Sequence, residues 1–271
     1  MFEPDLIQPE FEPPLIGPGD PPPFDVLNPD GAAPVVLICD HASPAIPGAL
    51  NDLGLDTSAL GHHVAVDIGA SDVTRSLSRR LDAPAVLAGY SRLLIDMNRP
   101  TGDPESILEI SDGIPVPGNR GLSEEEIAGR EETFFWPYHR AIADITAQLW
   151  RRGPAPVLFS VHSFTPSLNG EERRWDVGVL WNRDPRLALP LIQNLCRRDV
   201  LRVGDNEPYS GREKAYTIDR HAGAQGLPAC AVEIRQDHLK TSQGMDHWAE
   251  ILGDALKDIL TMETLHRVEH F

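Results

Sequence analysis

Short apolar runs that end on polar side chains are the most regular pattern in this chain. Residues 34–44 and 156–166 share it, since each begins with β-branched and other apolar residues. The first run leads into Asp40-His41, and the second leads into His162-Ser163. Runs of this length and composition predict buried strands. Ligands of open α/β sheets bind where strands end, so we expect His41 and His162 at the rim of a site.

Further segments show strand or helix patterns. Apolar runs predict strands at 85–88, 93–95, 176–181 and 227–234. Three- to five-residue spacing of apolar positions predicts helices at 59–81, 123–149, 187–196 and, near the C-terminus, around 248–259. The second of these helices begins at a capping box, Ser123 to Glu126, and Pro137 is expected to kink it.

Proline divides the chain into two parts. Residues 1–34 hold ten of the 25 prolines, and proline fixes φ and removes a backbone donor. We therefore expect an extended arm at 1–34 and one domain at 35–271. The arm could wrap around the domain or around a neighbouring subunit, and the second case would make a homo-oligomer. The alternative is a mobile tail.

Composition narrows the classes of function. The net charge of −17 argues against nucleic acid as a partner, because nucleic-acid binding needs a basic face. Cys39, Cys196 and Cys230 are widely spaced, as is typical of free thiols in a reducing compartment. No apolar run approaches the ~20 residues of a membrane span, and no signal peptide is evident. The sequence thus favours a cytoplasmic protein.

Two histidines and one carboxylate are candidate metal ligands. Imidazole nitrogen is a common ligand of catalytic zinc, which makes His41 and His162 the first candidates. Helical spacing over 59–81 would place His63 and Asp67 on one face, with Asp67 as a third ligand. The alternative is a solvated helix face. His139, just past Pro137, either faces the site or is structural.

Other polar side chains are suited to a substrate. Arg99 offers a planar two-donor fork for a carboxylate, and Asn98 adds a neutral donor. Glu233 and Arg235 lie near the end of the last predicted strand, where burial is costly unless the groups are paired or functional. The sequence around Ser91 lacks the final glycine of a nucleophile elbow, which disfavours a serine hydrolase.

Together these segments resemble the N-formylglutamate amidohydrolase family. The resemblance runs from about residue 35 to residue 260, and six stretches carry it: Asp40-His41-Ala42-Ser43, residues 90–100, Pro137-Tyr138-His139, His162-Ser163-Phe164, residues 206–211 and Glu233-Ile234-Arg235-Gln236-Asp237. It implies an α/β fold related to zinc exopeptidases, with three αβα layers and a mixed central sheet.

The resemblance also implies a site. It suggests one Zn²⁺ per chain, held by His41 and His162, with Glu233 as the catalytic base. Zinc carboxypeptidases take their first two ligands from His-x-x-Glu, but Pro44 stands three residues after His41 here, so Asp67 is our choice for the missing ligand. The substrate would be a small acidic N-acyl amino acid such as N-formylglutamate. Its binding residues would be Arg92, Asn98, Arg99, Tyr209, Ser210, Arg220 and Arg235.

Two other functions remain open at this stage. One is a catalytically silent relative that binds a small carboxylate ligand, which the missing His-x-x-Glu glutamate favours. The other is an assembly role in which the proline-rich arm makes the functional contact.

Overall fold

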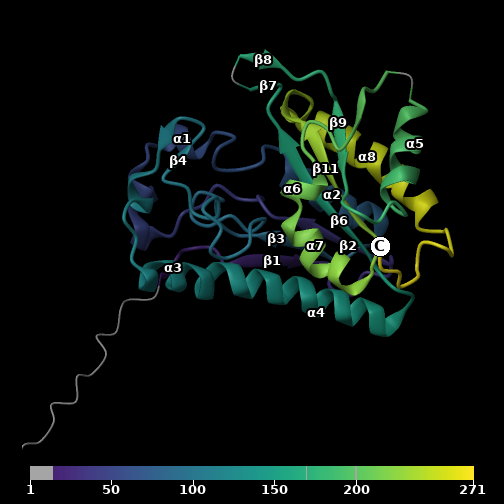
Figure 1. Cartoon of the computed structure of the whole chain (residues 1–271), viewed down its shortest axis with the longest axis horizontal. Helices are drawn as coiled ribbons and strands as arrows, with labels where there is room; N and C mark the ends of the chain where they lie inside the picture. The colour runs from purple at the N-terminus through teal and green to yellow at the C-terminus, as the bar shows by residue number, and fades with distance from the viewer. Residues whose placement is uncertain (1–14, 169, 199) are drawn as a thin grey trace, which may run out of the picture.

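A seven-stranded mixed sheet forms the centre of the molecule (Figure 1). The computed structural model describes residues 15–168, 170–198 and 200–271. The strands are β1 (Phe24–Leu27), β2 (Val35–Cys39), β3 (Ala85–Ala88), β6 (Val157–Phe164), β9 (Val177–Leu180), β10 (Val203–Asp205) and β11 (Ala229–Arg235). Their order is β1-β3-β2-β6-β11-β9-β10. Strands β3, β2, β6 and β11 run parallel, whereas β1 and β9 are antiparallel to their neighbours β3 and β11.

Helices cover both faces of this sheet. The α-helices of the described residues are α1 (Thr57–Leu60), α2 (Ala70–Leu81), α3 (Glu124–Arg130), α4 (Trp136–Arg152), α5 (Ala188–Cys196), α6 (Gly211–Lys214), α7 (Tyr216–His221) and α8 (Ser242–Ile259). Two small hairpins lie outside the central sheet, β4 (Ile110–Ser111) with β5 (Ile114–Pro115) and β7 (Ser167–Leu168) with β8 (Glu171–Glu172).

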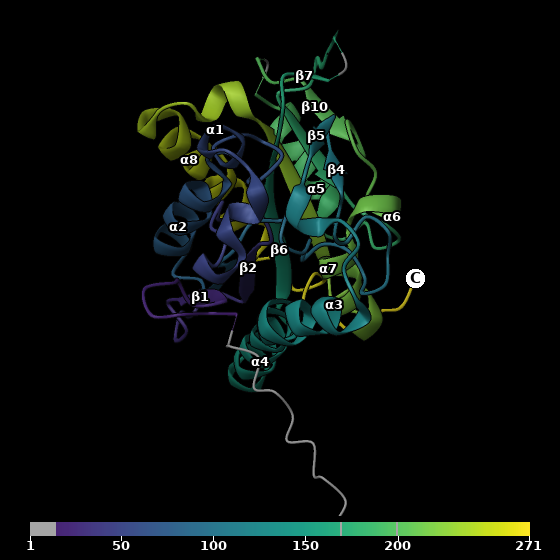
Figure 2. The ribbon, with the colours of Figure 1, turned by 90° about the vertical axis from the view of Figure 1, so that its left-hand side faces the viewer.

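The side chains of β2 show how the layers form. Leu37 and Cys39 join a core with α2, α5 and α8, whereas Val36 and Ile38 join another with α4. Successive side chains of a strand point to opposite faces, so a strand that is apolar throughout needs helices on both sides. Figure 2 shows α2 and α8 on one side of β6 and α7 on the other. The expected three-layer α/β fold with a mixed sheet is confirmed.

The predicted helix over 59–81 is wrong in its first half. Helix α2 begins only at Ala70, because Gly69 is in a left-handed conformation with φ 77°. A Cβ at Gly69 would lie 2.6 Å from Leu239 Cβ, so only glycine fits. Asp67 therefore lies in the turn before α2 and does not share a helix face with His63. Its backbone N–H instead donates to His41 O at 3.1 Å.

The apolar run at 93–95 is a buried turn and not the predicted strand. Leu94 N–H donates to Ser91 O at 3.0 Å, which closes the turn. Leu93, Leu94 and Ile95 are apolar because they fill the core on the α4 side. An apolar run of three residues does not distinguish these two structures.

The predicted helix over 123–149 forms with an interruption. The capping box at Ser123 is present and starts α3. A π-helical segment, Glu131–Phe135, separates α3 from α4, and Pro137 lies in the first turn of α4. The irregular backbone precedes the proline because its ring excludes the carbonyl one turn earlier.

The proline-rich arm contributes one strand to the domain. Residues 1–14 of the expected arm lie outside the described residues. Residues 24–27 form β1, which pairs with β3 at the edge of the sheet. Prolines 21–23 and 29 flank this strand, in keeping with the tolerance of edge strands for proline.

Candidate active site

The candidate metal ligands and the candidate base, Glu233, gather at the ends of three neighbouring strands. His41 follows β2, His162 lies in β6 and Glu233 lies in β11. Strands β6 and β11 are parallel, and His162 and Glu233 are partners in their register, so both side chains leave the sheet on the same face. Asp67 reaches the same place from the turn before α2. All four side chains are buried.

One nitrogen of each histidine meets the Asp67 carboxylate. Asp67 Oδ2 lies 3.2 Å from His41 Nδ1 and 2.9 Å from His162 Nδ1, and the two Nδ1 atoms are 3.3 Å apart. The ligand atoms of this group lie within 4.8 Å of one another. The structure thus brings together the three side chains expected to bind metal, although the predicted helix behind Asp67 is wrong.

The other nitrogen of each histidine meets a carboxylate that fixes its tautomer. His41 Nε2 donates to Asp96 Oδ1 at 2.7 Å, and His162 Nε2 donates to Asp40 Oδ2 at 3.1 Å. A neutral imidazole that carries its proton on Nε2 presents a lone pair on Nδ1. Carboxylates behind metal-binding histidines commonly orient the ring in this way. Each ring can therefore offer an Nδ1 lone pair to a cation on the side of the Asp67 carboxylate.

The buried side chains around the two histidines carry an excess of negative charge, which favours binding of a cation. Asp40, Asp67, Asp96 and Glu233 are buried carboxylates, and the Arg92 guanidinium pairs with two of them, at 2.7 Å from Asp96 and 3.5 Å from Asp67. Burial lowers the pKa of His162, but hydrogen bonds to Asp40 and Asp67 outweigh it and hold that pKa well above its usual range. The same site that attracts a proton attracts a metal ion.

The donor set fits zinc. Zinc takes nitrogen and oxygen ligands at ~2.0–2.2 Å in a tetrahedron, which sets neighbouring ligand atoms ~3.4 Å apart. The separations of 2.9, 3.2 and 3.3 Å among the three atoms are close to that value. Three protein ligands also leave a fourth position, as in catalytic zinc sites.

Glu233 lies beside this group with part of its carboxylate free. Its Oε2 is buried and has no hydrogen-bond partner among the residues that the structure describes. Burial raises the pKa of Glu233 to about 7. A buried carboxylate with an open oxygen is poorly suited to a purely structural role. It is well suited to accept a proton from a reacting group.

A cavity of about 200 Å³ opens over the cluster. The residues that line it come from distant parts of the sequence: His41, His63, Asp67, Arg92, Asn98, Arg99, His162, Ser163, Phe164, Thr165, Leu168, Tyr209, Lys214, Glu233 and Gln236. Four of the predicted substrate-binding residues are among them, namely Arg92, Asn98, Arg99 and Tyr209.

These four differ in what they offer a ligand. Asn98 is engaged by the backbone, since its side chain donates to Lys214 O and accepts from Thr217 N–H, both at 3.0 Å. The Tyr209 hydroxyl accepts a bond from Arg173 at 2.7 Å. The Arg99 guanidinium reaches Glu105, an exposed partner, at 3.1 Å.

The structure places the other three predicted substrate-binding residues away from this cavity. Ser210 caps α6 by accepting a bond from Arg212 N–H. The Arg220 guanidinium stacks over Trp136 and donates to Tyr216 Oη, and that of Arg235 pairs with Asp176 and Asp237. Arginine finds aromatic or carboxylate partners in many surroundings, so residue type alone misplaced these side chains.

Sequence reasoning did not single out the residues that support the histidines. Asp40 accepts hydrogen bonds from the hydroxyls of Tyr138 and Thr217, at 2.9 and 2.8 Å, besides its bond with His162. Asp96 binds His41 and Arg92. An aspartate directly before His41, and another at the start of Asp96-Met97-Asn98, were signals that could have indicated them.

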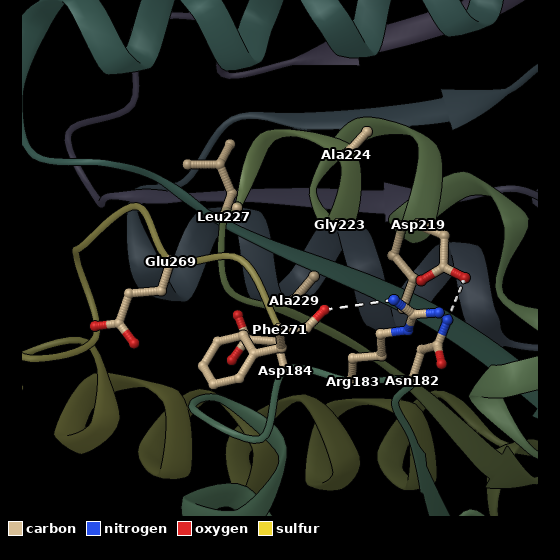
Figure 3. Close-up of a pocket in the computed structure, with 12 residues that line it drawn as sticks. Asn182, Arg183, Asp184, Asp219, Gly223, Ala224, Leu227, Ala229, Glu269 and Phe271 are labelled. Atoms are coloured by element: carbon tan, nitrogen blue, oxygen red, sulfur yellow. Dashed lines mark hydrogen bonds between the residues drawn. The ribbon is translucent and has the colours of Figure 1, made fainter.

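A larger cavity, about 340 Å³, lies elsewhere, between α7 and the C-terminal segment (Figure 3). Asn182 donates to Asp219 there at 3.0 Å, and Arg183 approaches Phe271 O at 3.5 Å. None of the candidate ligands lines it. The smaller cavity is the better candidate site because the buried charged groups converge on it.

His139 belongs to a second buried pair behind the site. It donates from Nε2 to Met97 O at 3.0 Å, so its Nδ1 accepts a bond from His221 Nε2 at 2.8 Å. Burial lowers the pKa of His139 to about 4, and burial together with His139 lowers that of His221 to about 3. Both rings are therefore neutral in the folded protein near pH 7.

This pair predicts a loss of stability in mild acid. Unfolded histidine has a pKa of ~6.5, so between pH 6.5 and 4 these two histidines bind protons in the unfolded chain and not in the folded one. Protonation therefore favours the unfolded chain as the pH falls. Between pH 7 and 5, His221→Gln should become more stable relative to the wild type by about 2 kcal/mol, because one such site is removed. Urea unfolding of both proteins at the two pH values measures this difference. Parallel pH dependences would contradict it.

Comparison with known proteins points to one class, hydrolases that act on amides. A profile of the N-formylglutamate amidohydrolase family matches residues 33–239, and the chain belongs to that family. None of the curated proteins matches the chain in sequence. In the part of the chain that the structure describes, no helix is long and apolar enough to span a bilayer.

Two solved structures show the extent of the likeness. The chain is similar to gene product Atu2144 from Agrobacterium tumefaciens, with 31% identity and a TM-score of 0.87 over 91% of this chain and 98% of that one. It is also similar to N-formylglutamate amidohydrolase from Ralstonia eutropha JMP134, with 19% identity and a TM-score of 0.70 over 88% of this chain and 97% of that one. The second likeness shows a shared fold.

Proposed function

We propose that this chain is a metal-dependent amidohydrolase that removes the formyl or another short acyl group from an acidic N-acyl amino acid such as N-formylglutamate. One observation carries the proposal. His41, Asp67 and His162 present their ligand atoms to one point, and the open carboxylate of Glu233 borders the same cavity.

Each side chain has a distinct role in this proposal. His41, Asp67 and His162 would hold Zn²⁺, and Asp96 and Asp40 would bind the Nε2 protons so that both Nδ1 atoms face the metal. Bound zinc supplies a Lewis acid that polarises the amide carbonyl and lowers the pKa of water to ~7. Glu233 takes the proton of the attacking water and delivers it to the leaving amine. Products are an amino acid and a short carboxylic acid.

The basic side chains of the cavity support an acidic substrate. Arg92, Arg99 and Lys214 line it, although the chain as a whole carries a net charge of −17. We propose that Arg99 binds the side-chain carboxylate and that Arg92 is the candidate for a second carboxylate. Release of formate from N-formyl-L-glutamate by the metal-loaded protein tests the function.

The Arg99 role predicts a selective defect. Arg99→Lys keeps the charge and loses the planar fork, so kcat/KM for N-formyl-L-glutamate should fall ~10-fold or more, a loss of ~1.4 kcal/mol or more. The same change should matter little for N-formyl-L-glutamine, whose side chain has no carboxylate.

Arg75→Lys provides the matched control. Arg75 pairs with Asp25 at 2.9 Å, a geometry like that of Arg99 with Glu105, but it lies on α2 and does not line the cavity. Arg75→Lys should leave kcat/KM unchanged for both substrates. Equal losses on glutamate and glutamine derivatives in Arg99→Lys would show that Arg99 is structural.

A further inference from the structure

Two basic side chains of the cavity share one carboxylate of the protein itself. Glu105 Oε2 lies 3.1 Å from Arg99 Nε and 2.8 Å from Lys214 Nζ. Arg99 and Lys214 line the cavity and Glu105 does not. Both cations therefore already hold a carboxylate oxygen at the edge of the candidate active site.

The backbone that carries Glu105 is fixed to the site. Ser106, the next residue, accepts a bond from Asp96 N–H at 2.8 Å, and Asp96 is the carboxylate behind His41. Glu105 N–H donates to Asp103 Oδ1 at 2.7 Å. The loop thus stays beside the cavity, while the Glu105 side chain extends over its surface and is 53% exposed.

The carboxylates paired with Arg92, Arg99 and Lys214 differ in how easily a ligand can displace them. The Arg92 guanidinium pairs with two buried carboxylates, the candidate ligand Asp67 and Asp96, which binds His41. The Glu105 side chain is 53% exposed, against 12% for Arg99 and 38% for Lys214, so water competes mainly for the Glu105 carboxylate. Across the described residues, Glu105 is also the sole carboxylate paired with Arg99 or Lys214. A ligand can displace it without disturbing the metal cluster.

We propose that Glu105 is an internal competitor for the substrate's side-chain carboxylate. Its carboxylate occupies the Arg99–Lys214 pair in the free enzyme, and the side-chain carboxylate of an acidic N-acyl amino acid replaces it on binding. The inference rests on the proposed function and extends it to Lys214 and Glu105. A neutral side chain cannot replace Glu105, so the exchange favours acidic substrates over neutral ones.

A binding experiment in an inactive background tests the exchange. In Glu233→Gln protein loaded with zinc, the Kd of N-formyl-L-glutamate and of N-formyl-L-glutamine is measured by calorimetry, with and without Glu105→Gln. Removal of the competitor should tighten the glutamate derivative about 3- to 10-fold, because binding no longer has to break the two ion pairs of Glu105, and should leave the glutamine derivative within about 2-fold. Lys214→Met should weaken only the glutamate derivative, by about 10-fold.

Asp25→Asn is the matched control. It removes an exposed carboxylate from the Arg75 pair and should change neither Kd. Unchanged or weaker binding of the glutamate derivative in Glu105→Gln would overturn the proposal, as would equal tightening of both ligands or no binding of either. Turnover of N-formyl-L-glutamate is measured separately, with protein that keeps Glu233. Absence of turnover would contradict the proposed function, whereas the binding data alone decide whether Glu105 competes with the substrate.

Discussion

Glu233→Gln is expected to lower kcat by at least about 100-fold, the lower end of general acid–base contributions. Glutamine keeps the size of the side chain and loses the ability to accept and return a proton. Because Glu233 Oε2 has no partner in the described part of the chain, the substitution leaves no hydrogen-bond donor orphaned there. Steady-state hydrolysis of the best N-formyl substrate measures the effect.

Two further measurements distinguish loss of the base from loss of the metal or of the fold. Metal content should remain one per chain, since Glu233 is not among the candidate ligands. The melting temperature should stay the same or rise, because an unpaired buried carboxylate is costly in the folded state. A near wild-type kcat would exclude the role of Glu233 as base, and loss of folding would indicate a structural ion pair instead.

His41→Ala and His162→Ala are each expected to weaken zinc binding by more than about 100-fold, because loss of an outer-shell partner alone costs 10–100-fold. Each variant removes one of the two imidazole ligands and leaves Asp67 with a single imidazole neighbour. Metal analysis after dialysis against graded zinc concentrations gives the affinity.

His247→Ala is the control for these variants. His247 is exposed on α8 and is not part of the ligand group, so its loss should leave zinc binding unchanged. If the doubly substituted protein, His41→Ala with His162→Ala, binds zinc as tightly as the wild type, the metal site is misplaced.

The sequence predicted the parts of the site that depend on strands. Apolar runs ending in Asp40-His41 and in His162-Ser163 indicated where β2 and β6 end, and these strands are neighbours in the sheet. The strand that carries Glu233 was likewise predicted, and it borders β6. A continuous apolar run is a local signal, and parallel strands then bring their ends together at one edge of the sheet.

Asp67 shows where local reasoning failed. Helical spacing suggested it, yet it lies in a turn whose form depends on the contact between Gly69 and Leu239, residues far apart in the sequence. The positions of Arg220 and Arg235 depended on partners that the pattern did not specify, such as Trp136 and Asp176. Long side chains with many potential partners are placed by tertiary packing and not by local spacing.

The most direct measurement follows formate release from N-formyl-L-glutamate by one preparation in three states: as metal-loaded protein, after chelation, and after zinc is restored. We expect hydrolysis in the first state, its loss in the second and its recovery in the third, with one zinc per chain in the active states. Hydrolysis that persists in metal-free protein, or no hydrolysis of any N-acyl acidic amino acid by zinc-loaded protein, would contradict a metal-dependent amidohydrolase site at His41, Asp67 and His162.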